Sequence, residues 1–280
     1  MENKVIQIRK FDGEIEEFKV EKLKNSLRRS KASENEIDEI VKSIAPSLYD
    51  GMPSKDIYKK AFSLLKKHNR TSASKYSLKR AILDLGPTGY PFERLVGALL
   101  RYKGFQTKIG AILQGECVSH EVDILAEKDG NTYTVECKFH SDPKSISNVK
   151  VPLYIHSRFL DIQKRWNKDP KKATHLKQGW LVTNTRFSED AIDYAKCVGL
   201  QLLSWNYPEN NGIKQNVDKF ALYPITTLTA LTKHEKDLLI ENNIILTKEL
   251  YESSFILDKI SVSPLRKKRI MKEIKDLCNF

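Results

Sequence analysis

The stretch Val122-Asp123-Ile124-Leu125 is followed, thirteen residues after its aspartate, by Glu136-Cys137-Lys138. Between them, Gly130-Asn131 is a turn signal that separates two runs of β-type residues, 121–126 and 132–139. Tight turns of this kind join antiparallel strands. The sequence therefore predicts a β-hairpin that carries two carboxylates and a lysine among apolar residues.

Side-chain alternation decides which charges of this hairpin meet. Residues two apart on a strand share a face, so Glu121 lies with Asp123, and Glu136 lies with Lys138. If the two faces coincide, Asp123 and Glu136 can hold Mg²⁺ or Mn²⁺ through oxygen ligands, with Glu121 as a further metal ligand. A carboxylate with apolar neighbours on both sides, as Asp123 is, is costly to bury without a cation or donor. Lys138 would then position or activate the attacking water and stabilise charge on a phosphate.

A helix is predicted just before the hairpin, from Pro91 to about Tyr102. Its apolar residues recur at helical spacing, and Glu93 stands beside this stripe near the first turn. Two interpretations of Glu93 stay open. As a catalytic residue it orients a metal ligand or water; as a structural one it is a first-turn glutamate favoured by the helix dipole.

The hairpin and its flanking segments resemble the PD-(D/E)xK nucleases, whose signature is D-x(n)-E-x-K, and more narrowly the Mrr-type restriction endonuclease domain. The similarity covers roughly residues 86 to 206 and is carried by Tyr90-Pro91-Phe92-Glu93-Arg94-Leu95, Lys103-Gly104-Phe105, Gly179-Trp180-Leu181-Val182-Thr183-Asn184, Phe187-Ser188-Glu189-Asp190-Ala191 and Gly199-Leu200-Gln201-Leu202-Leu203. The resemblance implies a restriction-endonuclease-like sheet and metal-dependent hydrolysis of DNA by Asp123, Glu136 and Lys138. It also implies that the backbone carbonyl of Cys137 ligates the metal.

Composition favours a nucleic-acid partner. The chain has 280 residues, with 48 Lys and Arg against 36 Asp and Glu, and a net charge of +12. Such an excess of positive charge favours a polyanionic binding partner. The alternative is a soluble protein that is basic without binding one. No apolar run approaches the ~20 residues that span a bilayer, so no membrane partner is expected. Four cysteines without a CxxC pair, and an N-terminus without a signal-peptide core, indicate a reducing cytoplasm.

The N-terminal region is predicted to begin with a second hairpin. Two β-like runs within residues 5–18 surround the turn Asp12-Gly13, and helical patterns follow to about Leu85. Ser33 with Glu36 predicts a capping box, and Pro53-Ser54 the start of another helix.

Two segments of this region are similar to the ATP-cone, a regulatory nucleotide-binding module. Ile8-Arg9-Lys10-Phe11-Asp12-Gly13 looks like its V-x-K-R-D-G motif, and Phe18-Lys19-Val20-Glu21-Lys22-Leu23 looks like its F-x-x-x-K-I motif. The resemblance implies that ATP or dATP binds as a regulatory ligand and that Lys10 and Lys22 meet its phosphates. Further nucleotide-binding candidates are Arg9, Ser54 and Arg80, with Lys79 beside the last.

Phe11 stands where the ATP-cone family usually has arginine, which removes one cation from the implied phosphate site. A solvated edge or a DNA-contacting arm is the alternative for this basic hairpin. The chain has no Walker-type glycine loop, so ATP hydrolysis is not indicated. A bound nucleotide is therefore expected to regulate the activity of the protein.

Basic residues after the nuclease-like hairpin are candidates for phosphate contacts. Residues 145–166 form a predicted helical region and are followed by a basic loop, with Tyr154 or Trp166 available for stacking and with cations at Lys150, His156, Arg158, Lys164, Arg165, Lys168, Lys171, Lys172 and Lys177. The alternative is that these basic residues form a solvated surface without a binding role.

The C-terminal part is predicted to be helical after a loop or linker at residues 207–217. Helical patterns cover 233–243, 247–254 and 263–277, with Ser263 as the N-cap of the last. The run Arg266 to Arg269 would touch backbone phosphates, or the segment is a packing or dimerisation appendage, which leaves a homo-oligomer open.

These observations predict an α/β protein: an ATP-cone-like domain (1–85), a nuclease domain with a central restriction-endonuclease-like sheet flanked by helices (86–210), and a small helical domain (218–280). The predicted function is that of a Mg²⁺-dependent DNA endonuclease regulated by nucleotide. The alternative is a nucleotide-responsive DNA-binding regulator in which the nuclease fold is a non-catalytic scaffold.

Overall fold

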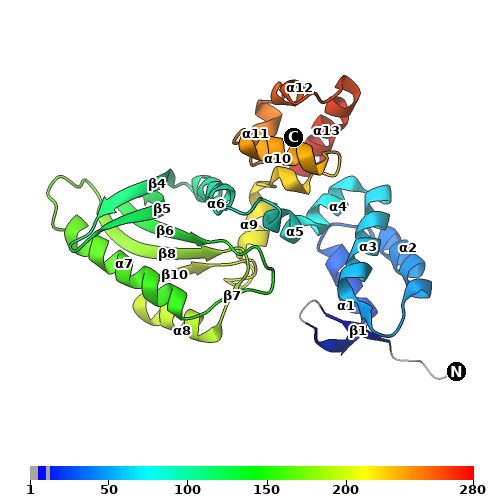
Figure 1. Cartoon of the computed structure of the whole chain (residues 1–280), viewed down its shortest axis with the longest axis horizontal. Helices are drawn as coiled ribbons and strands as arrows, with labels where there is room; N and C mark the ends of the chain where they lie inside the picture. Colours follow the sequence, from blue (N-terminus) through cyan, green and yellow to red (C-terminus); the bar gives the residue numbers. More distant parts are fainter. Residues whose placement is uncertain (1–5, 11–12) are drawn as a thin grey trace.

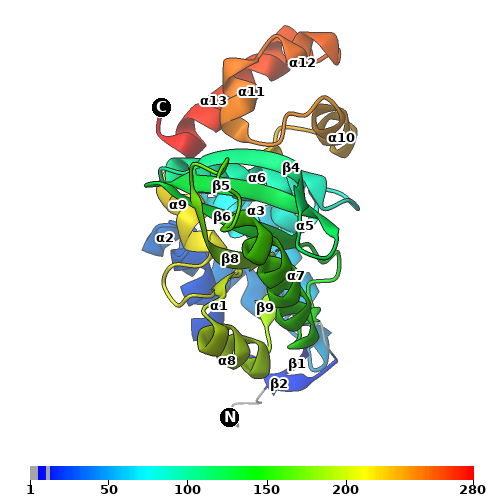
Figure 2. The same ribbon diagram turned by 90° about the vertical axis from the view of Figure 1, so that its left-hand side faces the viewer.

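The computed structural model describes residues 6–10 and 13–280. It places an N-terminal hairpin with helices at one end, a central sheet at the other, and the C-terminal helices above the junction (Figure 1). Helix α6 covers one face of the sheet, and helices α7 and α8 cover the other (Figure 2). The expected α/β class is confirmed.

The N-terminal part is a small three-stranded sheet packed on short helices. Strands β1 (Gln7–Arg9) and β2 (Ile15–Glu17) form the expected antiparallel hairpin, and β3 (Met52–Pro53) pairs parallel with β1. The helices are α1 (Val20–Arg28), α2 (Glu34–Ile44), η1 (Ala45–Ser47), α3 (Ser54–His68), α4 (Arg70–Tyr76) and α5 (Leu78–Leu83). Helices α1 to α4 enclose a core of their own, which includes Leu27, Ile37, Ile40 and Leu65, whereas α5 packs in the core of the central sheet.

Local signals explain where these helices begin. The capping box of Ser33 and Glu36 is present at the start of α2, and Pro53 precedes α3. The last predicted helix is divided in two: Asn69 caps α4 by accepting the backbone N–H of Ser72 at 3.0 Å, and α5 begins after Ser77.

The central sheet has the order β10-β8-β6-β5-β4. Its strands are β4 (Gln106–Gln114), β5 (Ser119–Lys128), β6 (Asn131–Lys138), β8 (His175–Thr183) and β10 (Gln201–Leu203). Strands β4, β5 and β6 are antiparallel, whereas β6, β8 and β10 are parallel. The predicted hairpin is therefore confirmed, and its second strand lies at the centre of the sheet.

Helices cover both faces of the sheet. Val135 and Val182 belong to one core with Phe92 and Leu95 of α6 (Tyr90–Tyr102), a helix that confirms the expected one. On the other face, Leu181 packs with Ile155 of α7 (Lys150–Trp166) and with Ala191 and Ala195 of α8 (Glu189–Val198). The site described below lies between this second face and α7.

The predicted helical region from Ser145 is wrong in its first residues. Ile146–Ser147 is strand β7, which pairs parallel with β9 (Arg186–Phe187). Helix α7 starts only at Lys150, because the Asn148 side chain accepts the Lys150 backbone N–H at 3.1 Å. A short loop therefore joins the end of β6 to α7.

The predicted linker at 207–217 is also wrong in its second half. Helix α9 (Ile213–Phe220) begins there, and its Ile213 and Val217 are 1% and 0% exposed. The Ile213 backbone N–H donates to the Ser204 carbonyl at 2.8 Å, which ties the helix start to the end of β10. Pro208, Asn210 and Asn211 precede this helix, whereas Asn216 lies within it.

The C-terminal part consists of η2 (Ile225–Thr227), α10 (Lys233–Glu241), α11 (Thr247–Glu252), α12 (Ile256–Lys259) and α13 (Pro264–Cys278). Ser263 stands at the N-cap position of α13 without a side-chain cap bond. Glu273 of α13 accepts from the Ser74 hydroxyl of α4 at 3.1 Å and from the Thr229 N–H at 2.6 Å. These helices therefore contact the N-terminal part directly.

Two of the four cations proposed for phosphate contacts in α13 have internal partners. Arg266 pairs with Glu235, and Lys267 pairs with Asp258 at 2.6 Å. Among the described residues, no helix is both long enough and apolar enough to cross a membrane.

Candidate functional site

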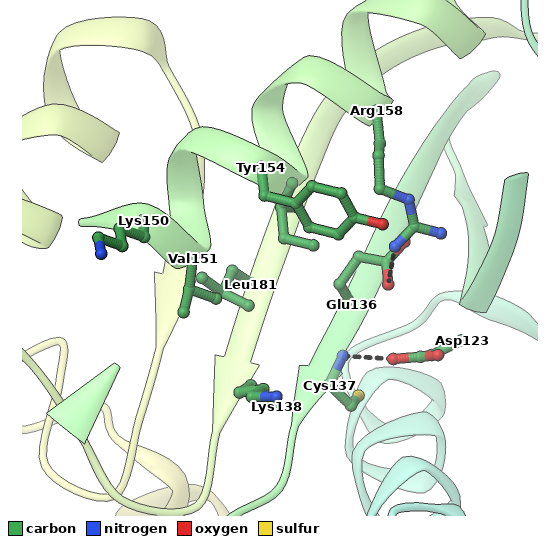
Figure 3. A pocket seen from close by; sticks show the side chains of 10 residues that line it. Asp123, Glu136, Cys137, Lys138, Lys150, Val151, Tyr154, Arg158 and Leu181 are labelled. Atoms are coloured by element: carbon green, nitrogen blue, oxygen red, sulfur yellow. Dashed lines mark hydrogen bonds and ion pairs between the residues drawn. The ribbon is translucent and has the colours of Figure 1, made fainter. Parts of the chain in front are cut away.

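Asp123 and Glu136 face each other across the hairpin. The pairing of Ile124 with Val135 places Asp123 opposite Glu136, on the face that α7 covers. Both carboxylates and Lys138 line one cavity of about 340 Å³, which we call the sheet cavity; residues of α7 close it (Figure 3). The alternation argument from the sequence and the observed lining agree for these side chains.

Each carboxylate has a different partner. Asp123 Oδ2 accepts the backbone N–H of Cys137 at 2.7 Å, whereas Glu136 Oε2 accepts from Arg158 Nη1 at 3.1 Å (Figure 3). The Arg158 guanidinium also donates to the Glu121 carbonyl and lies 5.4 Å from the centre of the Tyr154 ring. The arginine thus spans the hairpin from the side of α7.

Burial and neighbouring negative charges raise the pKa values of these acids. Glu136 is 8% exposed; desolvation and the charge of Asp123 raise its pKa to about 7, against the opposing effect of Arg158. Desolvation also raises the pKa of Asp123, and the Cys137 N–H opposes the rise. One arginine therefore leaves the negative charge of the pair incompletely compensated.

Glu93 of α6 belongs to the same electrostatic group. Its pKa is raised to about 7 by desolvation and then by the charges of Asp123 and Glu121. Glu93 does not line the sheet cavity, so it is near the two acids without sharing their surface.

The donor set of the sheet cavity fits a hard divalent cation. Desolvation raises the pKa values of both carboxylates, so added positive charge would stabilise their ionised forms, and oxygen donors suit Mg²⁺ or Mn²⁺. Among the described residues, no three His, Cys, Asp or Glu side chains are clustered closely enough to form a metal centre by themselves. Glu121, the third expected ligand, is exposed and is absent from the lining of the sheet cavity.

Residues of α7 complete the cavity, and the sequence argument missed their role there. The sequence predicts phosphate contacts for Arg158 and Lys150 and stacking for Tyr154, and all three line the sheet cavity. Their spacing of four residues along one helix is the signal that they share a face.

Lys10 and Lys22 converge on one carboxylate. Both ammonium groups lie near Oε2 of Glu16, at 3.2 Å for Lys10 and 2.9 Å for Lys22. Lys22, Glu16 and Ser54 line a cavity of about 240 Å³ together with Phe18, Tyr58 and Tyr76; we call it the hairpin cavity. It combines cations with aromatic walls, as a nucleotide requires.

The other nucleotide candidates lie elsewhere. Arg80 lines an adjacent cavity and pairs with Asp84 at 2.9 Å, whereas Arg9 is exposed and lines neither cavity. Phe11, the departure from the ATP-cone motif, lies outside the described residues.

Comparison with known proteins identifies both ends of the chain. Residues 6–84 match the ATP cone domain, so an ATP cone precedes the α/β sheet domain, and residues 223–278 match the C-terminal domain of AF1548-like proteins. An uncharacterised protein of Archaeoglobus fulgidus is 37% identical over 178 residues, which cover 63% of this chain and 96% of that protein. The crystal structure of AF1548, a protein of unknown function, is 35% identical with a TM-score of 0.56 and covers 69% of this chain and 99% of that one. The chain therefore belongs to the AF1548-like family.

A more distant likeness is to the DNA modification-dependent restriction endonuclease AspBHI. It is 14% identical with a TM-score of 0.34, covering 60% of this chain and 39% of that one. A likeness at this level adds no weight to the reading of the site.

Proposed function

We propose that this protein is a metal-dependent endodeoxyribonuclease whose activity responds to ATP or dATP bound in its cone. The convergence of Asp123, Glu136 and Lys138 on one cavity supports this function most directly. Their placement on a D and E-x-K hairpin agrees with the resemblance to the Mrr-type domain.

Asp123 and Glu136 would hold Mg²⁺ or Mn²⁺, with the Cys137 carbonyl as the implied additional ligand, and Glu93 would orient this group from α6. When bound, the cation supplies positive charge that offsets the charge of the attacked phosphodiester. Lys138 orients the attacking water and stabilises the negative charge that develops on the phosphoryl oxygens. Water adds to the phosphorus and gives up a proton, one P–O bond breaks, and the leaving oxygen takes up a proton.

DNA would reach the cavity along α7. Lys150 is exposed at its start, and Tyr154 is 63% exposed beside it, so a cation and an aromatic ring stand at the mouth of the cavity. Such groups hold backbone phosphates and bases without reading sequence. The expected cytoplasmic location and a homo-oligomer stay predictions.

One observation favours a non-catalytic alternative. Arg158 already pairs with Glu136, as in a scaffold that satisfies its charge internally. In that case the protein is a nucleotide-responsive DNA-binding regulator. The raised pKa of Glu136 despite this partner argues for the enzyme.

The test is cleavage of supercoiled plasmid DNA with Mg²⁺, Mn²⁺ or EDTA, each with and without ATP. A nuclease gives nicked or linear products with metal and none with EDTA, and a functional cone changes their rate. DNA binding without any product under all conditions supports the regulator.

A further inference from the structure

A second cavity, of about 560 Å³, lies at the seam between the cone and the sheet domain. It shares Ser54, Tyr58 and Tyr76 with the hairpin cavity, and Pro143, from the loop between β6 and α7, also lines it. We call it the seam cavity. A surface of the cone that begins at the nucleotide-binding candidates therefore ends against the sheet domain.

The far end of this path is positively charged. The seam cavity shares Lys79 and Pro143 with a further cavity of about 400 Å³, which Arg186 and Trp205 of the sheet domain line. Lys79 Nζ lies 5.9 Å from the centre of the Trp205 ring. Lys79 and Arg186 line this cavity together, and desolvation followed by the charge of Arg186 lowers the pKa of Lys79.

Neither cation of this pair has a carboxylate partner among the described residues, whereas Arg80 and Lys59 of the seam cavity pair with Asp84 and Asp56. Two like charges held close together repel each other unless an anion lies between them. The pair formed by Lys79 and Arg186 is therefore the part of the seam that a ligand with several negative charges fits best.

An aromatic pair lies along the path, where the hairpin cavity and the seam cavity meet. Tyr58 and Tyr76 stack with ring centres 5.1 Å apart and line both the hairpin cavity and the seam cavity. Aromatic walls, together with cations that have no carboxylate partner among the described residues, match a nucleoside polyphosphate better than the repeating backbone of DNA.

We propose that a nucleoside triphosphate bound in the cone extends its phosphates along the seam to Lys79 and Arg186, so that the sheet domain completes the nucleotide site. The inference rests on the proposed nucleotide regulation. Arg186 belongs to β9, which pairs with β7 in the loop that follows Lys138. Phosphates that bind Arg186 contact the strand that pairs with the segment leading from the catalytic strand to α7, and this pairing gives the nucleotide a route to the nuclease centre.

The experiment is calorimetric titration of ATP and AMP into the full chain and into Arg186→Gln. Arg186 is exposed, so its replacement leaves the core intact, and thermal unfolding of each variant checks this. We expect Arg186→Gln to weaken ATP binding about tenfold and to leave AMP binding unchanged, because only the triphosphate reaches the seam. Lys196→Gln, which removes an exposed cation of α8, is the matched control and is expected to change neither affinity.

The outcomes separate this inference from the function on which it rests. Equal ATP affinity in wild type and Arg186→Gln overturns the seam site and leaves nucleotide binding by the cone intact. Unchanged ATP affinity with weakened binding of a DNA duplex in EDTA also overturns it and assigns Arg186 to the DNA path. If the wild type binds no ATP, nucleotide regulation fails, and the seam site fails with it.

Discussion

Glu136 and Glu235 are both buried glutamates, each 8% exposed and each paired with an arginine, yet their pKa values move in opposite directions. The pKa of Glu235 falls to about 2, chiefly because Arg266 donates to it, with the Thr232 backbone N–H adding at 2.8 Å. The pKa of Glu136 rises to about 7, because one contact with Arg158 does not offset desolvation and the charge of Asp123.

The opposite pKa shifts distinguish an ion pair that stabilises the fold from a group of charges that is suited to bind a ligand. Around Glu235, three donors meet one carboxylate and its charge is satisfied. Around Glu136, acidic side chains outnumber cations in a desolvated environment, which is typical of functional sites. The C-terminal ion pair therefore provides an internal reference against which the sheet cavity can be tested.

The largest expected effect is on catalysis in Lys138→Ala. We expect cleavage to fall about 10²–10³-fold, because Lys138 acts on the transition state, whereas DNA affinity stays nearly unchanged, because one cation among many contributes little to phosphate binding. Plasmid cleavage and filter binding in EDTA measure the two quantities, with Lys196→Ala as the control. Equal loss of both would make Lys138 a binding residue only.

The sequence was sufficient to predict the central hairpin and its charges. Strand alternation and the turn at Gly130-Asn131 placed Asp123, Glu136 and Lys138 on one face, which the lining of the sheet cavity reproduces. These arguments use neighbours in the chain or across a tight turn, where geometry follows directly from the residue types.

Contacts between distant segments could not be predicted in the same way. The pairing of Arg158 with Glu136 depends on how α7 crosses the sheet, which no local pattern specifies. The 207–217 segment was mistaken for a linker, because its turn residues were visible, whereas burial of Ile213 and Val217 depends on tertiary packing. The same limit hid the seam cavity, whose lining comes from both halves of the chain.

The next largest effect is on the free energy of unfolding, and it tests the comparison of Glu235 with Glu136 directly. We expect Glu235→Gln to lower the free energy of unfolding at pH 7 by about 2 kcal/mol, because it removes a charge that its donors stabilise. Glu136→Gln should lower it by less than about 0.5 kcal/mol without metal, since it also removes repulsion with Asp123. Urea unfolding measures both.

The pH dependence of the first variant has a defined sign. The folded-state pKa of Glu235 lies below its unfolded value, so its contribution is complete above about pH 4.3 and is lost as the pH falls towards 2. The stability difference between wild type and Glu235→Gln should therefore shrink over this range. A comparable loss of stability in Glu136→Gln at pH 7 would remove the distinction between the two glutamates.

A smaller effect is expected at the cone, where two lysines share one carboxylate that is 25% exposed in its side chain. Lys10→Ala should weaken ATP binding about tenfold, because it removes one of the converging ammonium groups. Calorimetric titration measures this. The control is Lys24→Ala, which removes a cation of α1 that pairs with Asp38 of α2. Identical ATP binding in Lys10→Ala and wild type would remove Lys10 from the nucleotide site.

The smallest effect is the stabilisation that a metal gives to the folded protein. If the acids of the sheet cavity await a cation, Mg²⁺ at about ten times its Kd should stabilise the wild type by about 1.4 kcal/mol relative to EDTA, through mass action. Asp123→Asn should abolish most of this increase, because it removes one of the two carboxylates that face each other there. Glu127→Gln, four residues along the same strand and on the same face, should keep it. Thermal unfolding with Mg²⁺ and with EDTA measures the increase in each protein. An equal increase in wild type and Asp123→Asn would show that the ion binds elsewhere, and the sheet cavity would then resemble the satisfied pair at Glu235 more than a metal site.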